Sequence, residues 1–209
     1  MGGRGSTSGG REKGGKTNVT ILSQKDLISA RGTQQKEVDE TLTVFRDVYD
    51  EYNSQTNEIQ LVKIKENDVM AYYDRGGNIA VNEAYFGKNI DEAYADCVKS
   101  GWHPSNGNKT ALQATVAHEL GHQLTAEVAR KMGKDPVYEF DSVATTICNQ
   151  ARKTTKDKGV VIMAKKISRY ASVSNAEAIA EAYSDVYCNG KKAKKQSIAI
   201  MDVVNSYLK

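Results

Sequence analysis

The sequence contains little cysteine and no long apolar run. Its three cysteines, Cys97, Cys148 and Cys188, lie far apart among 209 residues and form no CxxC pair. This spacing argues against a disulfide framework and against a zinc site made of thiolates, and it favours a reducing compartment. A membrane span would need a run of about 18 apolar residues, which is absent, and the N-terminus lacks the apolar stretch of a signal peptide. We therefore expect a cytoplasmic protein without a membrane partner.

A strong excess of charge of one sign is also absent. The formal net charge is +3, and the basic excess lies mainly in the N-terminal stretch and in residues 191–195. A nucleic-acid partner is therefore not expected from the charge balance. Residues 191–195 are expected to be a solvated helix start. The length and the 39% of hydrophobic residues suit one globular domain.

The first 17 residues differ from the rest of the chain. They are rich in Gly, Ser, Lys and Arg and have no apolar anchor before Val19. Such a segment buries too little apolar surface to offset the entropy of ordering. We expect a disordered tail over residues 1–17, followed by a single domain over residues 18–209.

The spacing of apolar residues predicts an α+β fold. Between residues 33 and 52 they recur at three- and four-residue steps, which indicates an amphipathic helix that packs across a sheet. Strand-like segments follow at residues 59–64, 69–73 and 78–86, with a hairpin loop at 74–77; the last strand is a candidate edge for docking an extended peptide. From residue 109 onward the pattern is almost wholly helical, with helix ends expected at Gly133 and Gly190. A small, partly antiparallel sheet followed by helices is therefore predicted.

One predicted helix carries the residues of greatest chemical interest. Thr110 and Gln113 have the spacing of a capping box, and apolar residues recur at every fourth position from Leu112 to Val128. The helix therefore begins near residue 110 and buries one stripe.

Residues 118–122 of this helix read His-Glu-Leu-Gly-His, the HExxH pattern. A four-residue step leaves His118 and His122 about 40° and one turn apart, so that both imidazoles can bind one metal ion. Glu119 lies on the flank, where it can meet a metal-bound water. A catalytic zinc ion takes three protein ligands and keeps one position for water, so a third ligand must come from elsewhere. The metzincin continuation HExxHxxGxxH is excluded, because Thr125 and Val128 occupy its Gly and His positions.

The third ligand is expected from a later helix. Glu177, Glu181 and Asp185 follow one another at four-residue steps and share one helix face. Two registers are open: Glu177 as ligand with Glu181 behind it to orient a histidine, or Glu181 as ligand with Asp185 behind it. His103, the remaining histidine, lies in a polar loop. As a third ligand it would need a loop-supplied site, and we expect it to be exposed.

This later segment resembles two groups of zincin metallopeptidases. Residues 181–185, Glu-Ala-Tyr-Ser-Asp, are similar to the glutamate motif of thermolysin-like gluzincins. Residues 177–183, Glu-Ala-Ile-Ala-Glu-Ala-Tyr, resemble the longer ExxAEAF motif of anthrax-lethal-factor-like peptidases. In the second group a tyrosine seven residues before the ligand glutamate assists catalysis, and Tyr170 stands at that interval from Glu177. The resemblance implies a zincin-like fold with one Zn²⁺ per chain, and it favours Glu177 as the ligand and Glu181 as the residue that orients a histidine.

The first ten residues resemble a different group of proteins. They are similar to the tails of small metallopeptidases that tailed phages and prophages encode near head genes. This likeness implies the host-cell cytoplasm, or association with the virion, as the location, and phage structural proteins as partners.

The sequence thus predicts a zinc-dependent endopeptidase that acts on a peptide or protein substrate. In this prediction His118, His122 and Glu177 hold the metal, Glu119 is the general base and Tyr170 assists catalysis. The alternative is a non-catalytic phage head-associated or scaffold protein that retains a zincin fold. Glu119 separates the two hypotheses, because a purely structural zinc site does not need it.

Overall fold

The fold is described by a computed structural model for residues 20–22, 35–54, 56, 58–62, 64 and 69–209. The tail expected over residues 1–17 lies outside these residues. Along the chain the strands, helices and 3-10 turns are β1 Thr20–Leu22, α1 Gln35–Tyr52, β2 Glu58–Val62, β3 Ala71–Tyr73, β4 Asn78–Asn82, η3 Glu83–Tyr85, α2 Lys88–Lys99, α3 Ala111–Lys131, α4 Phe140–Thr155, α5 Val160–Lys165, η4 Tyr170–Ser172, α6 Asn175–Asn189, η5 Gly190–Lys192 and α7 Lys195–Leu208. Among the described helices, none combines the length and the apolar character needed to cross a bilayer.

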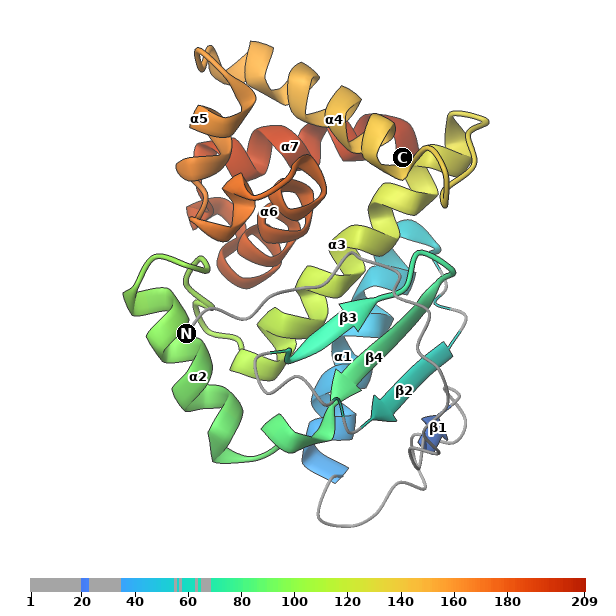
Figure 1. Ribbon diagram of the computed structural model, residues 1–209, viewed down its shortest axis with the longest axis vertical. Helices are drawn as coiled ribbons and strands as arrows, with labels where there is room; N and C mark the ends of the chain where they lie inside the picture. The colour runs from blue at the N-terminus through green and yellow to red at the C-terminus, as the bar shows by residue number, and fades with distance from the viewer. Residues whose placement is uncertain (1–19, 23–34, 55, 57, 63, 65–68) are drawn as a thin grey trace.

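A small mixed sheet lies on one side of the molecule, and most of the helices follow it in the chain (Figure 1). The strand order is β1-β2-β4-β3. β2 and β4 run parallel, with Ile59 beside Ile79, whereas β1 is antiparallel to β2 and β3 is antiparallel to β4. The predictions of an α+β class, a partly antiparallel sheet and a β3–β4 hairpin are confirmed. β1 is not predicted by the apolar pattern.

The strand predicted over residues 78–86 is wrong in two respects. β4 ends at Asn82, because the side-chain oxygen of Asn82 accepts a hydrogen bond from the Ala84 amide (3.1 Å) and caps η3. β4 also lies between β2 and β3, so both of its edges are already paired and it cannot dock an extended peptide. The edge strands of the described sheet are β1 and β3.

The helix predicted over residues 33–52 corresponds to α1, which the structure describes from Gln35 onward. Its inner face carries Val38, Leu42, Phe45 and Val48, each at most 3% exposed. Figure 1 shows α1 behind the sheet, and α1 also contacts α3. The amphipathic pattern thus correctly marks the face that joins the core.

α3 is the central helix of the molecule. It passes between the sheet and the C-terminal helices (Figure 1) and contacts α1, α6 and β3. Thr110 and Gln113 form the predicted capping box at its start, and Gly133, with φ 70°, follows its end. The predicted stripe is buried, but so is almost every position between its members. Polar side chains in the middle of α3 must therefore find partners inside the protein.

α6 packs closely against α3. A Cβ atom at Gly121 would lie 2.6 Å from the Cα atom of Ala180, so only glycine fits at this crossing. α6 begins where the Ser174 hydroxyl accepts a hydrogen bond from the Glu177 amide (3.1 Å), and it ends at Gly190 with φ 53°. The backbone of α6 is thereby fixed at both ends and at its crossing with α3.

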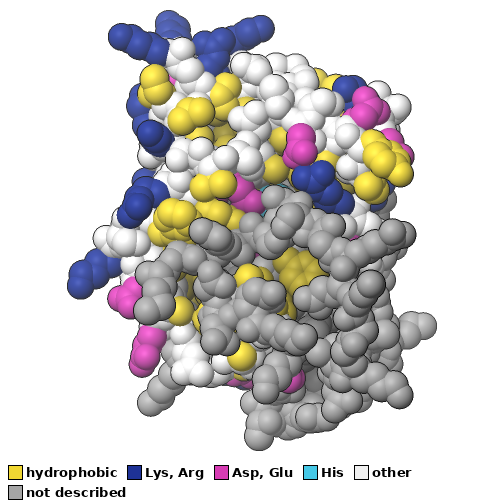
Figure 2. Space-filling model, viewed as in Figure 1, with side chains coloured by type: hydrophobic (Ala, Val, Ile, Leu, Met, Phe, Trp, Pro, Cys, Tyr) yellow, Lys and Arg dark blue, Asp and Glu magenta, His cyan; other side chains and the backbone are white. Residues whose placement is uncertain are grey.

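Exposed charge is unevenly distributed over the surface. Between residues 152 and 201 all four acidic side chains, Asp157, Glu177, Glu181 and Asp185, are buried. The lysines of the same stretch are exposed, and Figure 2 shows basic side chains gathered over the helical end of the molecule. The lysines of residues 191–195 are all exposed and lead into α7, in agreement with the solvated helix start expected there.

Candidate metal and catalytic site

The crossing of α3 and α6 brings together His118, His122 and Glu177. Each of them offers one ligand atom, and these atoms lie within 4.8 Å of one another. Oε2 of Glu177 is 3.1 Å from Nε2 of His118 and 3.5 Å from Nε2 of His122. The two imidazoles come from successive turns of α3, and the carboxylate comes from the first turn of α6.

Several polar atoms of this group are buried and have no hydrogen-bond partner among the described residues. They are Nε2 of His118, Nδ1 of His122 and both carboxylate oxygens of Glu177. Burial favours the neutral form of His118, but the adjacent carboxylates of Glu177 and Glu181 hold the pKa of the His118 imidazole well above its usual range. Burial likewise opposes the charge of Glu177, yet the adjacent His122 and His118 hold the pKa of its carboxyl well below the usual range. The group is therefore a buried cluster of charge in which ion-pair contacts replace hydration.

Glu181 lies one turn after Glu177 and contacts the other nitrogen of the same imidazole. Its Oε1 atom is 2.8 Å from Nδ1 of His118, and its side chain is 1% exposed. Burial would raise the pKa of Glu181, but the charge and hydrogen bonds of His103 and His118 hold it to about 2. This arrangement corresponds to the register in which Glu177 faces the metal and Glu181 orients a histidine.

Asp185 has partners of a different kind. Its carboxylate accepts hydrogen bonds from the Lys194 amide (2.9 Å), the Ser197 hydroxyl (2.6 Å) and the Asn189 side chain (2.9 Å). Within the described part of the chain, no hydrogen bond joins Asp185 to a histidine. Asp185 thus anchors the start of α7 to α6, and the structure does not bring it to the metal-ligand group.

Glu119 lies beside the group and is 4% exposed. Burial raises the pKa of its carboxyl, and the nearby His118 and His122 oppose that shift. A hydrogen bond from the backbone of Tyr73 in β3 also favours the charged form. The carboxylate is therefore held between the HExxH helix and an edge strand of the sheet.

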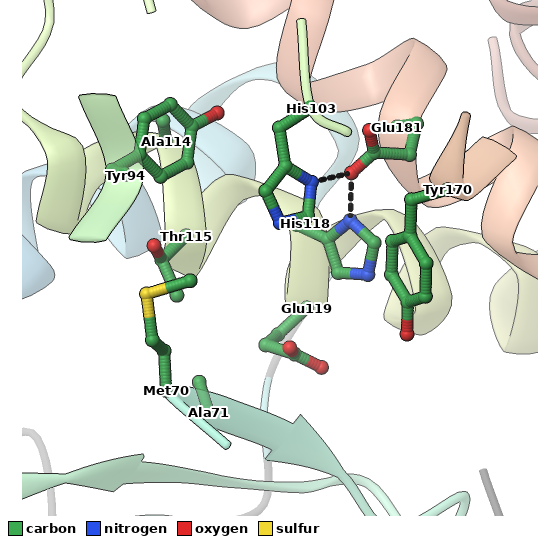
Figure 3. Close-up of a pocket in the computed structure, with 10 residues that line it drawn as sticks. All are labelled: Met70, Ala71, Tyr94, His103, Ala114, Thr115, His118, Glu119, Tyr170 and Glu181. Atoms are coloured by element: carbon green, nitrogen blue, oxygen red, sulfur yellow. Dashed lines mark hydrogen bonds and ion pairs between the residues drawn. The ribbon is translucent and has the colours of Figure 1, made fainter. Parts of the chain in front are cut away.

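Tyr170 comes from η4 and is 3% exposed. Its ring stacks on that of His118, with the centroids 5.6 Å apart and the planes 23° apart. Trp102 stacks on Tyr170 at 5.3 Å. Figure 3 shows the Tyr170 hydroxyl and the Glu119 carboxylate beyond the edge of the His118 ring that carries Nε2. The structure thus brings Tyr170 into the site at which the sequence interval predicted it.

A small pocket of about 30 Å³ opens at this place. Figure 3 shows that Glu119, His118 and Tyr170 line it together with small and apolar side chains. Its remaining lining residues are Met70, Ala71, Tyr94, His103, Ala114, Thr115 and Glu181. A reactant in the pocket would meet the candidate base and the candidate hydrogen-bond donor together.

His103 is not exposed as expected, and this prediction is wrong. Its side chain is 9% exposed, and its Nδ1 atom lies 2.9 Å from Oε1 of Glu181. Ser168, which the sequence did not single out, donates a hydrogen bond of 2.7 Å to Oε2 of Glu181. The only sequence signal for His103 is that it is the one histidine outside the HExxH pattern. No local pattern marks Ser168.

Comparison with known proteins finds no matching family model, no matching curated protein and no matching solved structure. The function must therefore be inferred from the side chains of the site.

Proposed function

We propose that this chain is a zinc-dependent endopeptidase with a zincin-like fold, of the lethal-factor-like or gluzincin type. One observation carries the proposal: His118, His122 and Glu177 form a buried group of potential metal ligands, and Glu119 lies directly beside it. Two imidazoles and one carboxylate are a known ligand set of catalytic zinc sites. The resemblance of residues 177–183 to the lethal-factor-like motif supports the same assignment.

The residues present fit a zinc ion. Buried nitrogen and oxygen atoms rarely lack partners, and Nε2 of His118 and both carboxylate oxygens of Glu177 have no hydrogen-bond partner among the described residues. A divalent cation would supply the missing partner and would offset the negative charge buried on α6. Three ligands leave one coordination position open, as a catalytic zinc site requires.

Each of these residues has one role in the reaction that we propose. Zinc, when bound, supplies a Lewis acid that lowers the pKa of a water molecule to about 7 and polarises a carbonyl group. Glu119 takes up the proton of the attacking water and passes it to the leaving amine. Tyr170 donates a hydrogen bond to the oxyanion, a contact that is often worth about 3 kcal/mol when preorganised. The peptide bond is thereby hydrolysed to a carboxylate and an amine.

The position of Glu119 favours catalysis over a purely structural metal site. Burying a carboxylate is costly unless it is paired, and burial raises the pKa of Glu119. Structural zinc sites are closed by four protein ligands and have no use for an additional buried acid. A non-catalytic head-associated or scaffold protein would keep the fold without needing this residue. Phage structural proteins as partners stay a prediction from the opening residues of the sequence.

The proposal is tested by digesting a peptide library with the purified protein. We expect cleavage when one equivalent of zinc is present, loss of cleavage when a chelator removes it, and recovery when zinc is restored. A zinc-loaded protein that cleaves no peptide would refute the catalytic assignment and favour the non-catalytic alternative.

A further inference from the structure

The carboxylate of Glu181 is held by donors from three separate segments. Oε1 contacts Nδ1 of His118 on α3 (2.8 Å) and Nδ1 of His103 in the loop between α2 and α3 (2.9 Å). Oε2 accepts a hydrogen bond from Ser168, which precedes η4 (2.7 Å). Figure 3 shows Glu181 between the two imidazoles. The orientation of the His118 ring therefore depends on how firmly His103 and Ser168 hold the Glu181 carboxylate.

The ring of His103 is itself fixed by its neighbours. It lies parallel to the ring of Tyr94 on α2, with the centroids 5.4 Å apart and the planes 7° apart. It meets the ring of Tyr170 edge-on at 5.4 Å. One stacked contact, one edge-on contact and one hydrogen bond hold the imidazole of His103 in an orientation in which Nδ1 points at Glu181.

The loop that carries His103 is tied to the segment that carries Tyr170. The Arg169 amide donates to the carbonyl of Gly101 (2.8 Å), and the Tyr170 amide donates to the carbonyl of Trp102 (3.1 Å). The two segments therefore form one wall, and His103 connects that wall to the carboxylate behind His118.

His103 does not belong to the metal-ligand group. The described residues with ligand atoms close enough to share one ion are His118, His122 and Glu177, and Nδ1 of His103 is directed at Glu181. The hydrogen bond of His103 can therefore affect metal binding only through Glu181, whereas its ring also meets the ring of His118 edge-on, with the centroids 6.2 Å apart.

We propose that His103 is a positioning residue that fixes Glu181 and thereby holds the His118 imidazole with Nε2 toward the metal. The proposal rests on the metal site of the proposed function. Residues that orient a metal-binding histidine typically change metal affinity about 10- to 100-fold when they are removed. His103 and His118 both contact Oε1 of Glu181, and His103 can affect the orientation of His118 through this shared oxygen.

The experiment compares zinc dissociation constants, measured by competition with a chromophoric chelator, for the wild type, His103→Ala and His103→Asn. We expect His103→Ala to bind zinc about 10- to 100-fold more weakly. The Asn side chain can place an N–H donor where Nδ1 lies, so His103→Asn should recover most of the affinity. Ser100→Ala is the matched control, because it removes a side-chain hydrogen bond just before the same loop, from the Ser100 hydroxyl to the Cys97 carbonyl (2.9 Å), at an exposed position without contact to Glu181. Its zinc affinity should equal that of the wild type.

Two outcomes would overturn the proposal. If His103→Ala binds zinc as tightly as the wild type, Glu181 does not need the hydrogen bond from His103. Equally weak binding in His103→Asn and His103→Ala would assign the effect to the ring stack and not to the hydrogen bond. If His103→Ala does not fold, His103→Asn decides alone, since a folded Asn variant with weak zinc binding contradicts the proposal.

A second measurement uses the metal-free protein. The Nδ1 proton of His118, seen by NMR, should exchange slowly in the wild type and in His103→Asn and should be lost or broadened in His103→Ala. The two proposals can therefore fail separately. If the wild type binds no zinc, the proposed function is refuted, but the NMR signal of the metal-free protein still tests whether His103 positions His118. Conversely, zinc binding without peptidase activity removes the catalytic assignment and leaves the role of His103 intact.

Discussion

Two carboxylates one helical turn apart contact the two nitrogens of one imidazole. Glu177 lies 3.1 Å from Nε2 of His118, and Glu181 lies 2.8 Å from Nδ1. A neutral imidazole has one donor and one acceptor nitrogen. If Nδ1–H donates to Glu181, Nε2 keeps its lone pair for a metal ion. In the absence of metal, a proton on Nε2 can satisfy Glu177, which is why the pKa of His118 is raised.

The different positions of the two glutamates predict different losses of zinc affinity. Glu181→Ala should weaken binding about 10- to 100-fold, because it removes the residue that orients His118. Glu177→Ala should weaken binding further, because it removes a direct ligand. A zinc titration of both variants measures the order. If Glu181→Ala binds zinc more weakly than Glu177→Ala, the thermolysin-like register is favoured and the argument for a catalytic role of Tyr170 is lost.

Glu119 is expected to act on the reaction and not on metal binding. Glu119→Gln should keep the fold and the zinc but lower peptide hydrolysis by about 100- to 10,000-fold, because Gln cannot accept the water proton. Glu127→Gln makes the same chemical change two turns later on α3, where the side chain contacts Arg130 (2.9 Å), and serves as the control. Turnover of the Glu119→Gln variant at the rate of this control would exclude Glu119 as the general base.

The sequence could predict which residues of α3 and α6 share a face, because helical spacing alone sets that geometry. It could not predict His103 or Ser168, since both reach Glu181 from loops whose paths depend on the packed structure. The choice between the two registers likewise needed a resemblance to a known family. Helix geometry permits both.

At the scale of the elements, the distance between α3 and α6 decides whether the histidines meet Glu177. Gly121 lies at the crossing and within the HExxH pattern. Replacing glycine by alanine in a helix would by itself stabilise it by up to about 1 kcal/mol. The added Cβ would, however, lie 2.6 Å from the backbone of Ala180, and overpacking of this kind typically costs about 1–3 kcal/mol. The steric cost therefore outweighs the gain in helix propensity.

Gly121→Ala should accordingly lower the melting temperature and also weaken zinc binding, because α6 must move and carries Glu177 with it. Gly159→Ala is the control, since a Cβ at Gly159 meets no atom within 4 Å. Calorimetry and a zinc titration of both variants test the prediction. A Gly121→Ala protein that melts as the wild type and binds zinc as tightly would show that α6 accommodates the methyl group.

A buried carboxylate outside the site joins three helical segments. Asp157, in the loop between α4 and α5, accepts hydrogen bonds from Lys166 at the end of α5 and from Gln196 in α7. The hydrogen bond from Lys166 lowers the pKa of this carboxyl below its usual value. The folded-state pKa of Asp157 lies below the unfolded-state value of about 3.9, so the ionised carboxylate stabilises the folded protein. This stabilisation is complete above the unfolded-state pKa and is lost as the pH falls through the folded-state pKa.

Asp157→Asn should therefore melt at a lower temperature than the wild type at neutral pH, and the difference should shrink below about pH 4. Asp202→Asn, a change at an exposed position of α7, should have no such effect. Melting curves at several pH values provide the measurement. A difference that persists unchanged in acid would mean that the charge of Asp157 is not its cause.

At the scale of the whole molecule, the net charge of +3 conceals a separation of charge. The acids between residues 152 and 201 are buried, and the lysines of the same stretch face solvent. Composition cannot show this, because the fold decides which charges are exposed. The α+β class and the helical second half were predictable, because periodicity is local. The interior position of β4 was not, because strand order depends on pairings between distant segments.

We propose that α3 and α6 form one zinc site from His118, His122 and Glu177. The most direct test of this proposal is the zinc content of the purified, metal-loaded protein, measured by native mass spectrometry for the wild type, His118→Ala and His122→Ala. We predict one zinc ion per chain in the wild type and none in either variant. A wild-type protein without zinc, or stoichiometric zinc retained in either variant, would contradict the account.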